Sequence, residues 1–391
     1  MKIAIVPGAF FPNPGGAQVQ AHNLANKICE KKHNAEMVLL DKTTIKKKKY
    51  KITFFNKIII NIIFLLHYYL NIDLTFLLKI YLKKFIKKNK YHIWHFIFLN
   101  YKSLLIINIL KKLNQKIIVT FQGADIQINK KINYGNRLDI KYEKLLQINK
   151  KNIDYFTAIS KNIYNDLLNL KIPKNKIIEI PNGTILSKAK QIKKQVKKNK
   201  VNKLKIITVA RYASKKKGFD LVEKILKILF EKKINFKWTI IGKNTSKILK
   251  TINDKKYINS LKIIEDLTNE NELYYPNSKI LKHYSKSDIY LNLSRIESFG
   301  ITFIESLSCN LPIITFDRKG ANEIVKNLNN GFVIKNKNFI SFIKYLNKFY
   351  KDKNFFKNRP YLSSRKYDLD QLIYIYIKTY NNLSNQNKLE P

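Results

Sequence analysis

The chain has 391 residues, 45% of them hydrophobic, so it is long and apolar enough for two domains with buried cores. Its 75 Lys and Arg against 27 Asp and Glu give a formal net charge of +48, which brings nucleic acid and anionic membrane into consideration as partners. Only two cysteines are present, Cys29 and Cys309, so no disulfide framework is expected and a reducing compartment is indicated.

The positive charge has two explanations that the sequence leaves open. Lys, Ile, Asn, Tyr and Phe are abundant together, and AT-rich codons encode them, so a biased genome can account for the lysines. The distribution of the lysines favours a functional role instead, because positions 42 to 124 hold seventeen Lys and one acid, Asp73. A basic binding protein for membrane or nucleic acid is therefore an alternative to an enzyme. Its weakness is that the aromatic residues fall mostly at periodic positions expected to be buried.

The first half of the chain alternates strands and helices. Lys2–Val6 is a short apolar run that predicts a buried parallel strand, and Gly15 and Gly16 then open a helical pattern. A strand, a glycine-bearing loop and a helix form the start of a mononucleotide-binding unit. Polar residues interrupt the apolar stretch 58–82, so no membrane-spanning helix is expected there. Further strands are predicted at 37–40, 92–96, 117–121 and 155–159, and an amphipathic helix with a lysine-rich outer face at 74–88.

The second half repeats the alternation after a basic segment. Residues 187–205 contain nine Lys and no acid, which is typical of a solvated linker. Strands are predicted at 204–209, 237–241, 289–293 and 313–316, with a helix at 218–230. The domains expected are a Rossmann-like domain at 1–186, a linker at 187–203, a second Rossmann-like domain at 204–365, a C-terminal helix at 366–383 and a polar tail at 384–391.

Two carboxylates eight positions apart, Glu297 and Glu305, flank a Ser-Phe-Gly turn and an apolar run that predicts a helix. Glu297 would lie on the loop at the helix N-terminus, and Asn310 could end the helix in a left-handed cap. Free backbone N–H groups at such a terminus attract anions, and nearby carboxylates can accept hydrogen bonds from sugar hydroxyls. The segment therefore predicts a site for a phosphorylated sugar, although an ordinary helix start with two solvated glutamates has the same pattern.

Two cations follow the predicted strand at 204–209. Arg211 comes directly after it, and Lys217 precedes Gly218 and a helix. This loop could hold a pyrophosphate and stabilise its charge as a leaving group. The alternative is a lysine-rich surface loop, because Lys215 and Lys216 adjoin.

These motifs, in their order and spacing, resemble glycosyltransferase family 4, whose retaining members have the GT-B fold. The residues that carry the resemblance are Pro12 to Ala17, Thr120 to Asp125, Pro181 to Gly183, Arg211, Lys217, Gly218, Glu297 to Glu305, Ser308 to Pro312, Gly320, Glu323, Asn330 and Gly331. The resemblance implies an α/β protein with two Rossmann-like domains facing across a cleft and a C-terminal helix returning to the first domain. It also implies a retaining, hexosyltransferase-type enzyme that moves a sugar from a nucleotide-diphospho-sugar to a glycan or lipid-linked acceptor.

The resemblance also implies roles for individual residues. Arg211 and Lys217 would bind the donor diphosphate, Glu305 the ribose hydroxyls and Glu297 the transferred sugar. The implied donor site comprises Gly15, Gly16, Arg211, Lys217, Glu297, Ser298, Phe299, Gly300, Ile301 and Glu305. The implied catalytic set is Glu297, Arg211, Lys217 and Asp125. Gln122 and Asp125 lie on the acceptor side, and Gln122, where many relatives have His, cannot act as a general base.

No metal and no cofactor are expected. His92 and His95 share a predicted strand and would face opposite sides of it, which disfavours joint ligation of a metal. We expect a cytoplasmic protein, peripheral on the inner membrane of a bacterium, that acts in cell-envelope polysaccharide or lipopolysaccharide synthesis. Nucleic acid is not expected as a partner. A GT-B epimerase or hydrolase acting on the nucleotide-sugar alone is the alternative among enzymes.

Overall fold

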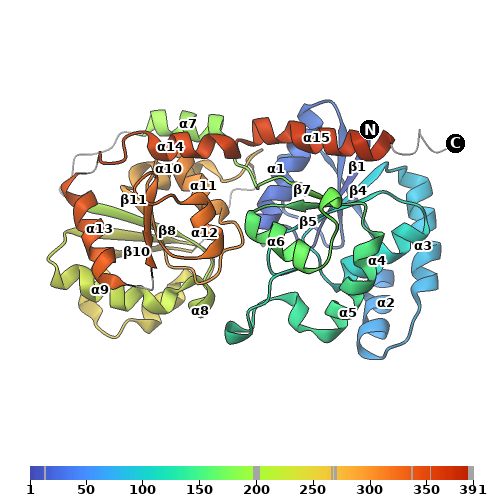
Figure 1. The fold of residues 1–391 in the computed structure, drawn as a ribbon, viewed down its shortest axis with the longest axis horizontal. Coiled ribbons are helices and arrows are strands. Elements are labelled where there is room, and N and C mark those ends of the chain that lie inside the picture. Colours follow the sequence, from blue (N-terminus) through green and yellow to red (C-terminus); the bar gives the residue numbers. More distant parts are fainter. Residues whose placement is uncertain are drawn as a thin grey trace. The chain divides into compact units, whose positions relative to one another are not determined.

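The fold was analysed in a computed structural model, which describes residues 1–12, 15–196, 203–265, 267, 271–335, 338–352 and 354–385 (Figure 1). Asn13 and Pro14 of the N-terminal motif lie outside these ranges, as does the tail from 386 onward. The chain divides into two compact units. Unit 1 comprises residues 1–182, 270–274 and 369–391. Unit 2 comprises residues 183–269 and 275–368.

Unit 1 is built on a parallel sheet of seven strands in the order β3-β2-β1-β4-β5-β6-β7. Its central strands are continuous apolar runs because helices cover both faces of a parallel sheet. Ile5 of β1 lies opposite Met37 on one side and His95 on the other. The strands are β1 (Lys2–Pro7), β2 (Asn34–Leu39), β3 (Lys51–Phe54), β4 (Ile93–Ile97), β5 (Ile117–Phe121), β6 (Tyr155–Ala158) and β7 (Ile177–Glu179).

The helices of unit 1 include one from the far end of the chain. They are α1 (Gly16–Glu30), α2 (Lys57–Tyr69), α3 (Thr75–Asn89), α4 (Tyr101–Lys112), α5 (Ile140–Asn149), α6 (Lys161–Asn169) and α15 (Leu369–Asn385). Helix α15 packs beside α1 and buries Tyr376, Tyr380 and Leu383 in the core of unit 1 (Figure 1). This confirms the predicted return of the C-terminal helix to the first domain. Of the described helices, none is both long and apolar enough to cross a membrane.

Unit 2 has a parallel sheet of six strands in the order β10-β9-β8-β11-β12-β13. The strands are β8 (Leu204–Val209), β9 (Phe236–Ile241), β10 (Leu261–Ile264), β11 (Ile289–Asn292), β12 (Ile313–Phe316) and β13 (Gly331–Ile334). The helices are α7 (Leu186–Gln195), α8 (Ser214–Lys217), α9 (Val222–Glu231), α10 (Ser278–Lys286), α11 (Ile301–Ser308), α12 (Lys319–Ile324), α13 (Phe339–Lys351) and α14 (Arg359–Ser364). Two α/β units with parallel sheets confirm the predicted fold class.

Three predictions about chain organisation need correction. Residues 187–195 are not a linker, because they lie in α7, whose Ala189 and Ile192 are buried while two of its four lysines are exposed. The rest of the predicted linker, 197–202, lies outside the described residues. Residues 271–274, placed by sequence within the second domain, belong to unit 1. Helix α15 continues to Asn385, two residues beyond the predicted helix end.

Asparagine occupies several positions with a left-handed backbone conformation, which glycine often adopts. Asn310 has φ 57°, so the predicted left-handed position after α11 is confirmed. Its amide donates to the carbonyl of Lys357 at 2.8 Å, and its side-chain oxygen accepts from the backbone N–H of Tyr361 at 3.1 Å. The cap of α11 thereby also fixes the start of α14.

Candidate active site

The loop after β8 carries the first predicted donor residue. Arg211 follows the strand by two residues, and its side chain is exposed. The backbone on either side of it is held, since Ala210 donates to the carbonyl of Ile241 and Tyr212 donates to that of Lys243, both at 2.9 Å. The guanidinium is therefore free to meet an anion while its backbone is fixed at the carboxyl end of the sheet.

The second predicted cation, Lys217, lies in an ion pair with Glu297. The ammonium nitrogen is 2.7 Å from Oε1, and the two side chains are 20% and 9% exposed. Gly218 makes this approach possible, because it has φ 70° and a Cβ there would lie 2.1 Å from the carbonyl oxygen of Leu293. The structure thus brings together a lysine and a glutamate that are eighty positions apart in sequence.

The charges of this cluster influence one another. Burial alone would raise the pKa of Glu297, but Lys217, a hydrogen bond from Ser294 and the charge of Lys216 outweigh it and lower the pKa. The pKa of Lys216 is also lowered: burial and the charges of Lys217 and Arg211 bring it to about 8, against the opposing charge of Glu297. Lys216 and Lys217 both act on the Glu297 carboxylate and Arg211 repels Lys216, so a bound anion would relieve the repulsion among these cations.

Sequence reasoning missed the group that holds this cluster in place. The guanidinium of Arg295 donates to both carboxylate oxygens of Asp220 at 2.6 Å and to the carbonyl of Lys215 at 2.6 Å. The backbone N–H of Arg295 also donates to the carbonyl of Lys216 at 2.9 Å. A bidentate arginine is a rigid clamp. The sequence offered one indication of its importance: arginine is rare in this lysine-rich chain, and Arg295 is one of only six.

Helix α11 begins where the sequence predicted. Gly300 precedes it with φ 90°, and Tyr290 of β11 hydrogen-bonds the hydroxyl of Thr302 at 2.8 Å, which ties the helix start to the sheet. Ser298 and Phe299 are 8% and 3% exposed. Of the predicted donor residues from Ser298 to Ile301, the first two are therefore buried, and their contact with a donor stays a prediction.

The second glutamate of the signature is buried. Glu305 is 5% exposed, and the hydroxyl of Tyr284 donates to its Oε2 at 3.2 Å. Burial raises its pKa to about 8, although the Tyr284 hydrogen bond and the charge of Lys188 act in the opposite direction. The carboxyl is therefore largely protonated at neutral pH and can both donate and accept hydrogen bonds.

In unit 1, the predicted glycines lie at the start of α1. Gly15 is the residue before the helix, and its backbone N–H donates to Oε1 of Gln18 at 2.9 Å. Gly16 is the first helical residue. The structure tests no phosphate contact of this loop, so that role stays a prediction.

The loop after β5 carries the predicted acceptor-side residues. Gln122 and Asn182 exchange two side-chain hydrogen bonds, of 3.3 and 3.0 Å. Asp125 has no exposed surface, and its carboxylate accepts from the backbone N–H groups of Leu99, Gln122 and Gly123. Burial raises its pKa to about 6 against the effect of these bonds. Buried in this way, Asp125 holds the loop, and its catalytic role stays a prediction.

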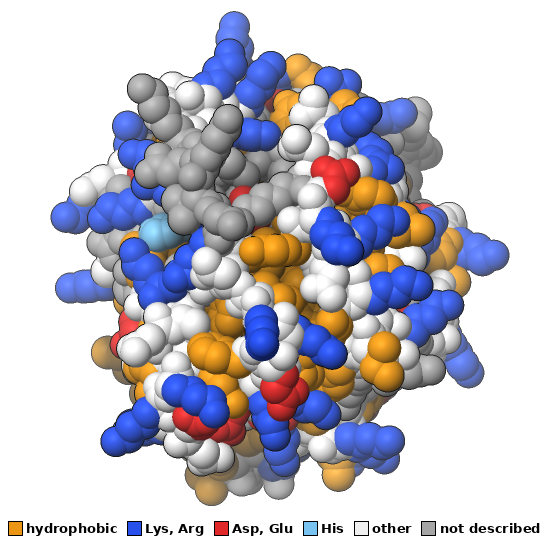
Figure 2. All heavy atoms as spheres, turned by 90° about the vertical axis from the view of Figure 1, so that its left-hand side faces the viewer, with side chains coloured by type: hydrophobic (Ala, Val, Ile, Leu, Met, Phe, Trp, Pro, Cys, Tyr) orange, Lys and Arg blue, Asp and Glu red, His pale blue; other side chains and the backbone are white. Residues whose placement is uncertain are grey.

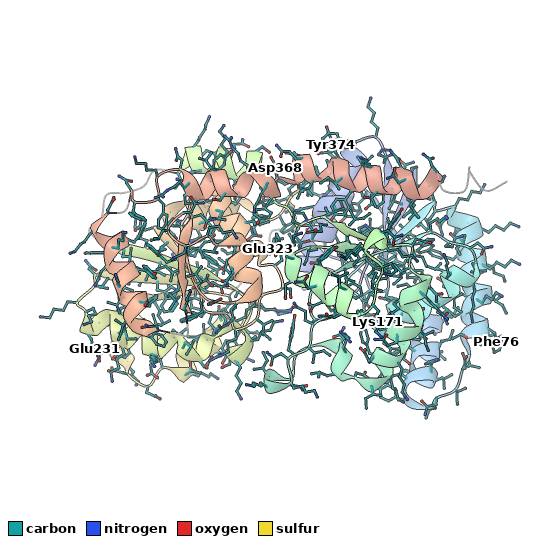
Figure 3. The ribbon with its side chains drawn as sticks, in the orientation of Figure 1. Phe76, Lys171, Glu231, Glu323, Asp368 and Tyr374 are labelled. Carbon is teal, nitrogen blue, oxygen red and sulfur yellow. The ribbon has the colours of Figure 1, made fainter. Side chains whose placement is uncertain are left out.

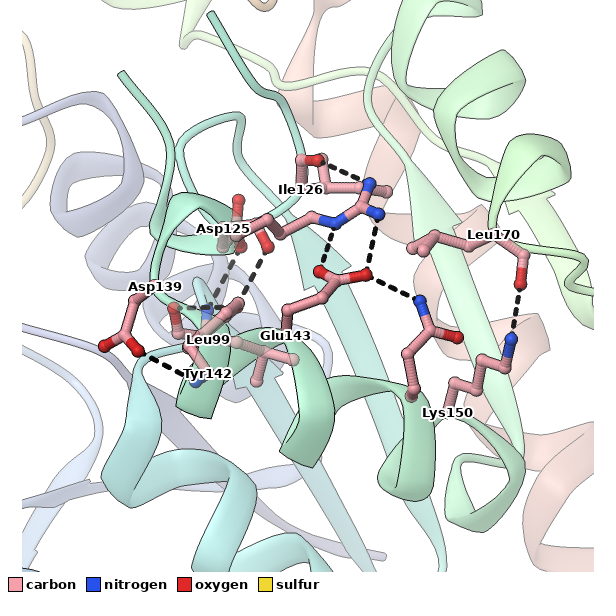
Figure 4. Close-up of polar contacts among 10 residues, drawn as sticks. Leu99, Asp125, Ile126, Asp139, Tyr142, Glu143, Lys150 and Leu170 are labelled. Atoms are coloured by element: carbon pink, nitrogen blue, oxygen red, sulfur yellow. Dashed lines mark hydrogen bonds and ion pairs between the residues drawn. The ribbon is translucent and has the colours of Figure 1, made fainter. Parts of the chain in front are cut away.

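Neighbouring contacts reinforce this loop (Figure 4). The hydroxyl of Tyr142 on α5 donates to the carbonyl of Asp125 at 2.9 Å. Arg137 donates to both oxygens of Glu143, at 2.7 and 2.9 Å, and to the carbonyl of Ile126 at 3.1 Å. The backbone after β5 is thus fixed from the side of α5.

His92 and His95, the two histidines considered above as metal ligands, have different hydrogen-bond partners. His95 is fully buried in β4, where Nδ1 contacts the hydroxyl of Tyr380 and Nε2 that of Thr120, each at 2.7 Å. Burial lowers its pKa to about 3, so the ring is neutral. Nδ1 of His92 accepts from the backbone N–H of Lys2 at 3.0 Å. Within the described ranges, no group of three or more His, Cys, Asp or Glu could hold a metal ion.

Comparison with known proteins identifies the family. A model described as Glycosyltransferase Family 4 matches residues 14–188, and one described as Glycosyl transferases group 1 matches residues 189–367. Together they span most of both units, whose sheets have the architecture of GT-B glycosyltransferases. The chain belongs to glycosyltransferase family 4.

Individual relatives are distant. An "Uncharacterized 41.2 kDa protein in cps region" of Klebsiella pneumoniae is 26% identical over 64% of this chain and 67% of that protein. An "Alpha-monoglucosyldiacylglycerol synthase" of Acholeplasma laidlawii is 32% identical over 42% of each chain. The crystal structure of Anabaena Alr3699/HepE in complex with UDP and glucose matches 97% of this chain and 99% of that one, with a TM-score of 0.72 and 14% identity. The last comparison supports the fold only.

Proposed function

We propose that the protein transfers a hexosyl group, with retention of configuration, from a nucleotide-diphospho-sugar to a glycan or lipid-linked acceptor. The observation that carries the proposal is the cluster at the carboxyl end of the unit 2 sheet, where Lys217 pairs with Glu297, Lys216 also acts on Glu297, and Arg211 lies close enough to act on Lys216. Such a cluster suits a diphosphate that gains charge as it leaves. The match to a glycosyltransferase family supplies the reaction class.

In this proposal the bond from the anomeric carbon to the diphosphate oxygen breaks, and the acceptor oxygen bonds to the same face of that carbon. The acceptor hydroxyl proton moves to the departing diphosphate, so no protein base is required. Arg211 and Lys217 stabilise the diphosphate, and Glu297 binds the sugar while its pair with Lys217 keeps it ionised. Glu305 binds the ribose hydroxyls. Gly15 and Gly16 permit close approach of the backbone to the donor phosphate, and Asp125 fixes the loop that bears Gln122.

The setting proposed is cell-envelope polysaccharide or lipopolysaccharide synthesis at the cytoplasmic face of the inner membrane. The protein from a cps region and the diacylglycerol glycoside synthase among the relatives support envelope and lipid acceptors respectively. The free thiols of Cys29 and Cys309 are compatible with a reducing compartment.

A thermal-shift panel of UDP-, GDP- and ADP-sugars tests the donor. One nucleotide series should stabilise the protein, and Arg211→Ala should abolish the shift. Lys227→Ala is the matched control, because Lys227 is an exposed lysine of α9 in the same unit. A shift that survives Arg211→Ala contradicts the donor site. Donor consumption without any acceptor would instead favour the epimerase or hydrolase.

A further inference from the structure

Exposed apolar side chains are concentrated in one part of unit 1. Of the nineteen large hydrophobic side chains that are exposed in the described residues, ten lie between positions 54 and 80. Helix α2 alone exposes Ile58, Ile62, Leu65 and Tyr69, at 71%, 49%, 49% and 64%. Their spacing places them on one face of the helix.

Helix α3 continues the surface with a change of character along its length. Phe76 and Ile80 are 58% and 54% exposed, and Phe76 lies at the outer edge of unit 1 (Figure 3). One turn further on, the same side of the helix carries Lys83, Lys84 and Lys87, all exposed. We call these nine residues of α2 and α3 the hairpin surface.

The hairpin surface is not needed to close the core of unit 1. The opposite sides of the two helices bury Ile60, Ile63, Leu78 and Leu82, and both helices pack against α4. Each helix thus has its own inward face and a second apolar face that no described element covers. A concentration of exposed apolar side chains of this kind marks a binding site for a protein or a membrane.

Charge decides between these two classes of partner. Asp73 is the only acid between positions 42 and 124, and its carboxylate already accepts from the backbone N–H of Thr75 at 2.8 Å. Lysine alone would not be informative, because Lys and Arg also cover the face of unit 2 in Figure 2. Here the lysines stand beside exposed Ile, Leu and aromatic side chains on amphipathic helices, the composition of helices that lie in the interface of an anionic bilayer.

We infer that the hairpin surface binds an anionic lipid bilayer, with the apolar side chains of α2 and the start of α3 inserted and the lysines of α3 at the headgroups. The helices lie in the interface rather than span it, since α2 has 13 residues and α3 has 15, whereas a span needs about 20. The inference rests on the proposed function in one respect: a bilayer is where a lipid-linked acceptor would be found.

Sedimentation of the full chain with vesicles tests the inference. The parent protein should bind vesicles of phosphatidylglycerol and phosphatidylcholine far better than phosphatidylcholine alone, and high salt should weaken the binding. Lys83→Gln/Lys84→Gln/Lys87→Gln should reduce binding about 100-fold, at about fivefold per lysine. Ile62→Ser/Phe76→Ser should reduce it at least about tenfold. Ile340→Ser, which alters an 82% exposed Ile of α13 in unit 2, should not change it.

Fluorescence separates insertion from surface attraction. Both natural tryptophans, Trp94 and Trp238, have no exposed surface, so they provide a baseline. A tryptophan introduced by Phe76→Trp should be quenched by brominated acyl chains in anionic vesicles, and one introduced by Ile340→Trp should not.

Three outcomes would overturn the inference: equal binding to neutral vesicles, undiminished binding of both hairpin variants, or self-association through this surface without vesicle binding. Melting temperature and nucleotide binding are measured on the same samples. Loss of vesicle binding with intact nucleotide binding leaves the proposed function standing, and the converse result leaves the membrane inference standing.

Discussion

Replacement of Glu305 by Gln should change the pH dependence of stability. The carboxyl of Glu305 is buried in α11, and its pKa is about 8 in the folded protein against 4.5 for the exposed group. The folded state therefore holds a proton that the unfolded state releases, and stability falls as pH rises between these two values. The Gln side chain has a similar shape but carries no charge at any pH, so the variant lacks this decline.

The magnitude follows from the two pKa values. Between about pH 5 and about pH 8, the linkage relation gives the parent protein a loss of about 3 kcal/mol relative to Glu305→Gln. Urea unfolding of both proteins at the two pH values measures this difference, and the comparison cancels every other titrating group. Glu297→Gln serves as control. The pKa of Glu297 is lowered, so its contribution is lost only below the usual carboxyl range and is constant over this window.

An identical pH response of the parent and Glu305→Gln would refute the reasoning, because it would mean that Glu305 is ionised in the folded protein. A parallel response of Glu297→Gln and Glu305→Gln would show that the effect is not specific to the buried carboxyl. The same samples allow a functional measurement. Glu305→Gln should weaken binding of the bare nucleoside diphosphate in calorimetry, whereas Glu297→Gln should mainly reduce turnover.

Four further variants test the cluster in unit 2. Arg211→Ala should lower the transfer rate by about 10²–10³ without loss of stability, since its side chain is exposed, and steady-state rates with melting temperatures measure both. Arg295→Lys should lower the rate while Asp220→Asn, which spares the arginine, has a smaller effect; equal activity of Arg295→Lys and parent would exclude the clamp. Gly218→Ala should destabilise the protein by a few kcal/mol in urea unfolding, because its φ of 70° and the carbonyl of Leu293 at 2.1 Å leave no room for a Cβ. Unchanged stability would contradict that geometry.

The strands buried on both faces were the most predictable elements. The observed limits of β5, β8 and β12 are those expected, since a central parallel strand is a continuous apolar run that stops where the sheet ends. Helix α7 was not predictable by the same argument. Four of its ten residues are lysines and only three positions are buried, so its composition is that of a linker, whereas its packing against α10 and α11 stabilises it as a helix.

Some features of the candidate site could likewise be predicted from the sequence, and others could not. The sequence located Arg211, Lys217, Glu297 and Glu305 through motif spacing, and Lys217 and Glu297 meet in the structure. It could not show that Lys217 is paired with a buried partner. Lys217→Ala would therefore leave the buried Glu297 carboxylate without its counter-charge and should destabilise the protein. It also could not show that Asp125 is enclosed by backbone N–H groups, because those groups come from a loop and from a strand end far apart in the sequence.

The origin of α15 has a consequence for biosynthesis. Unit 1 takes part of its core, Tyr376, Tyr380 and Leu383, from the last helix of the chain, and Tyr380 satisfies the buried ring of His95. A ribosome releases that helix only after all of unit 2 has been made. Unit 2, formed almost entirely from 183–368, has its complete sequence earlier. The second unit can therefore reach its native state first, whereas the core of the N-terminal unit stays incomplete until α15 has been synthesised.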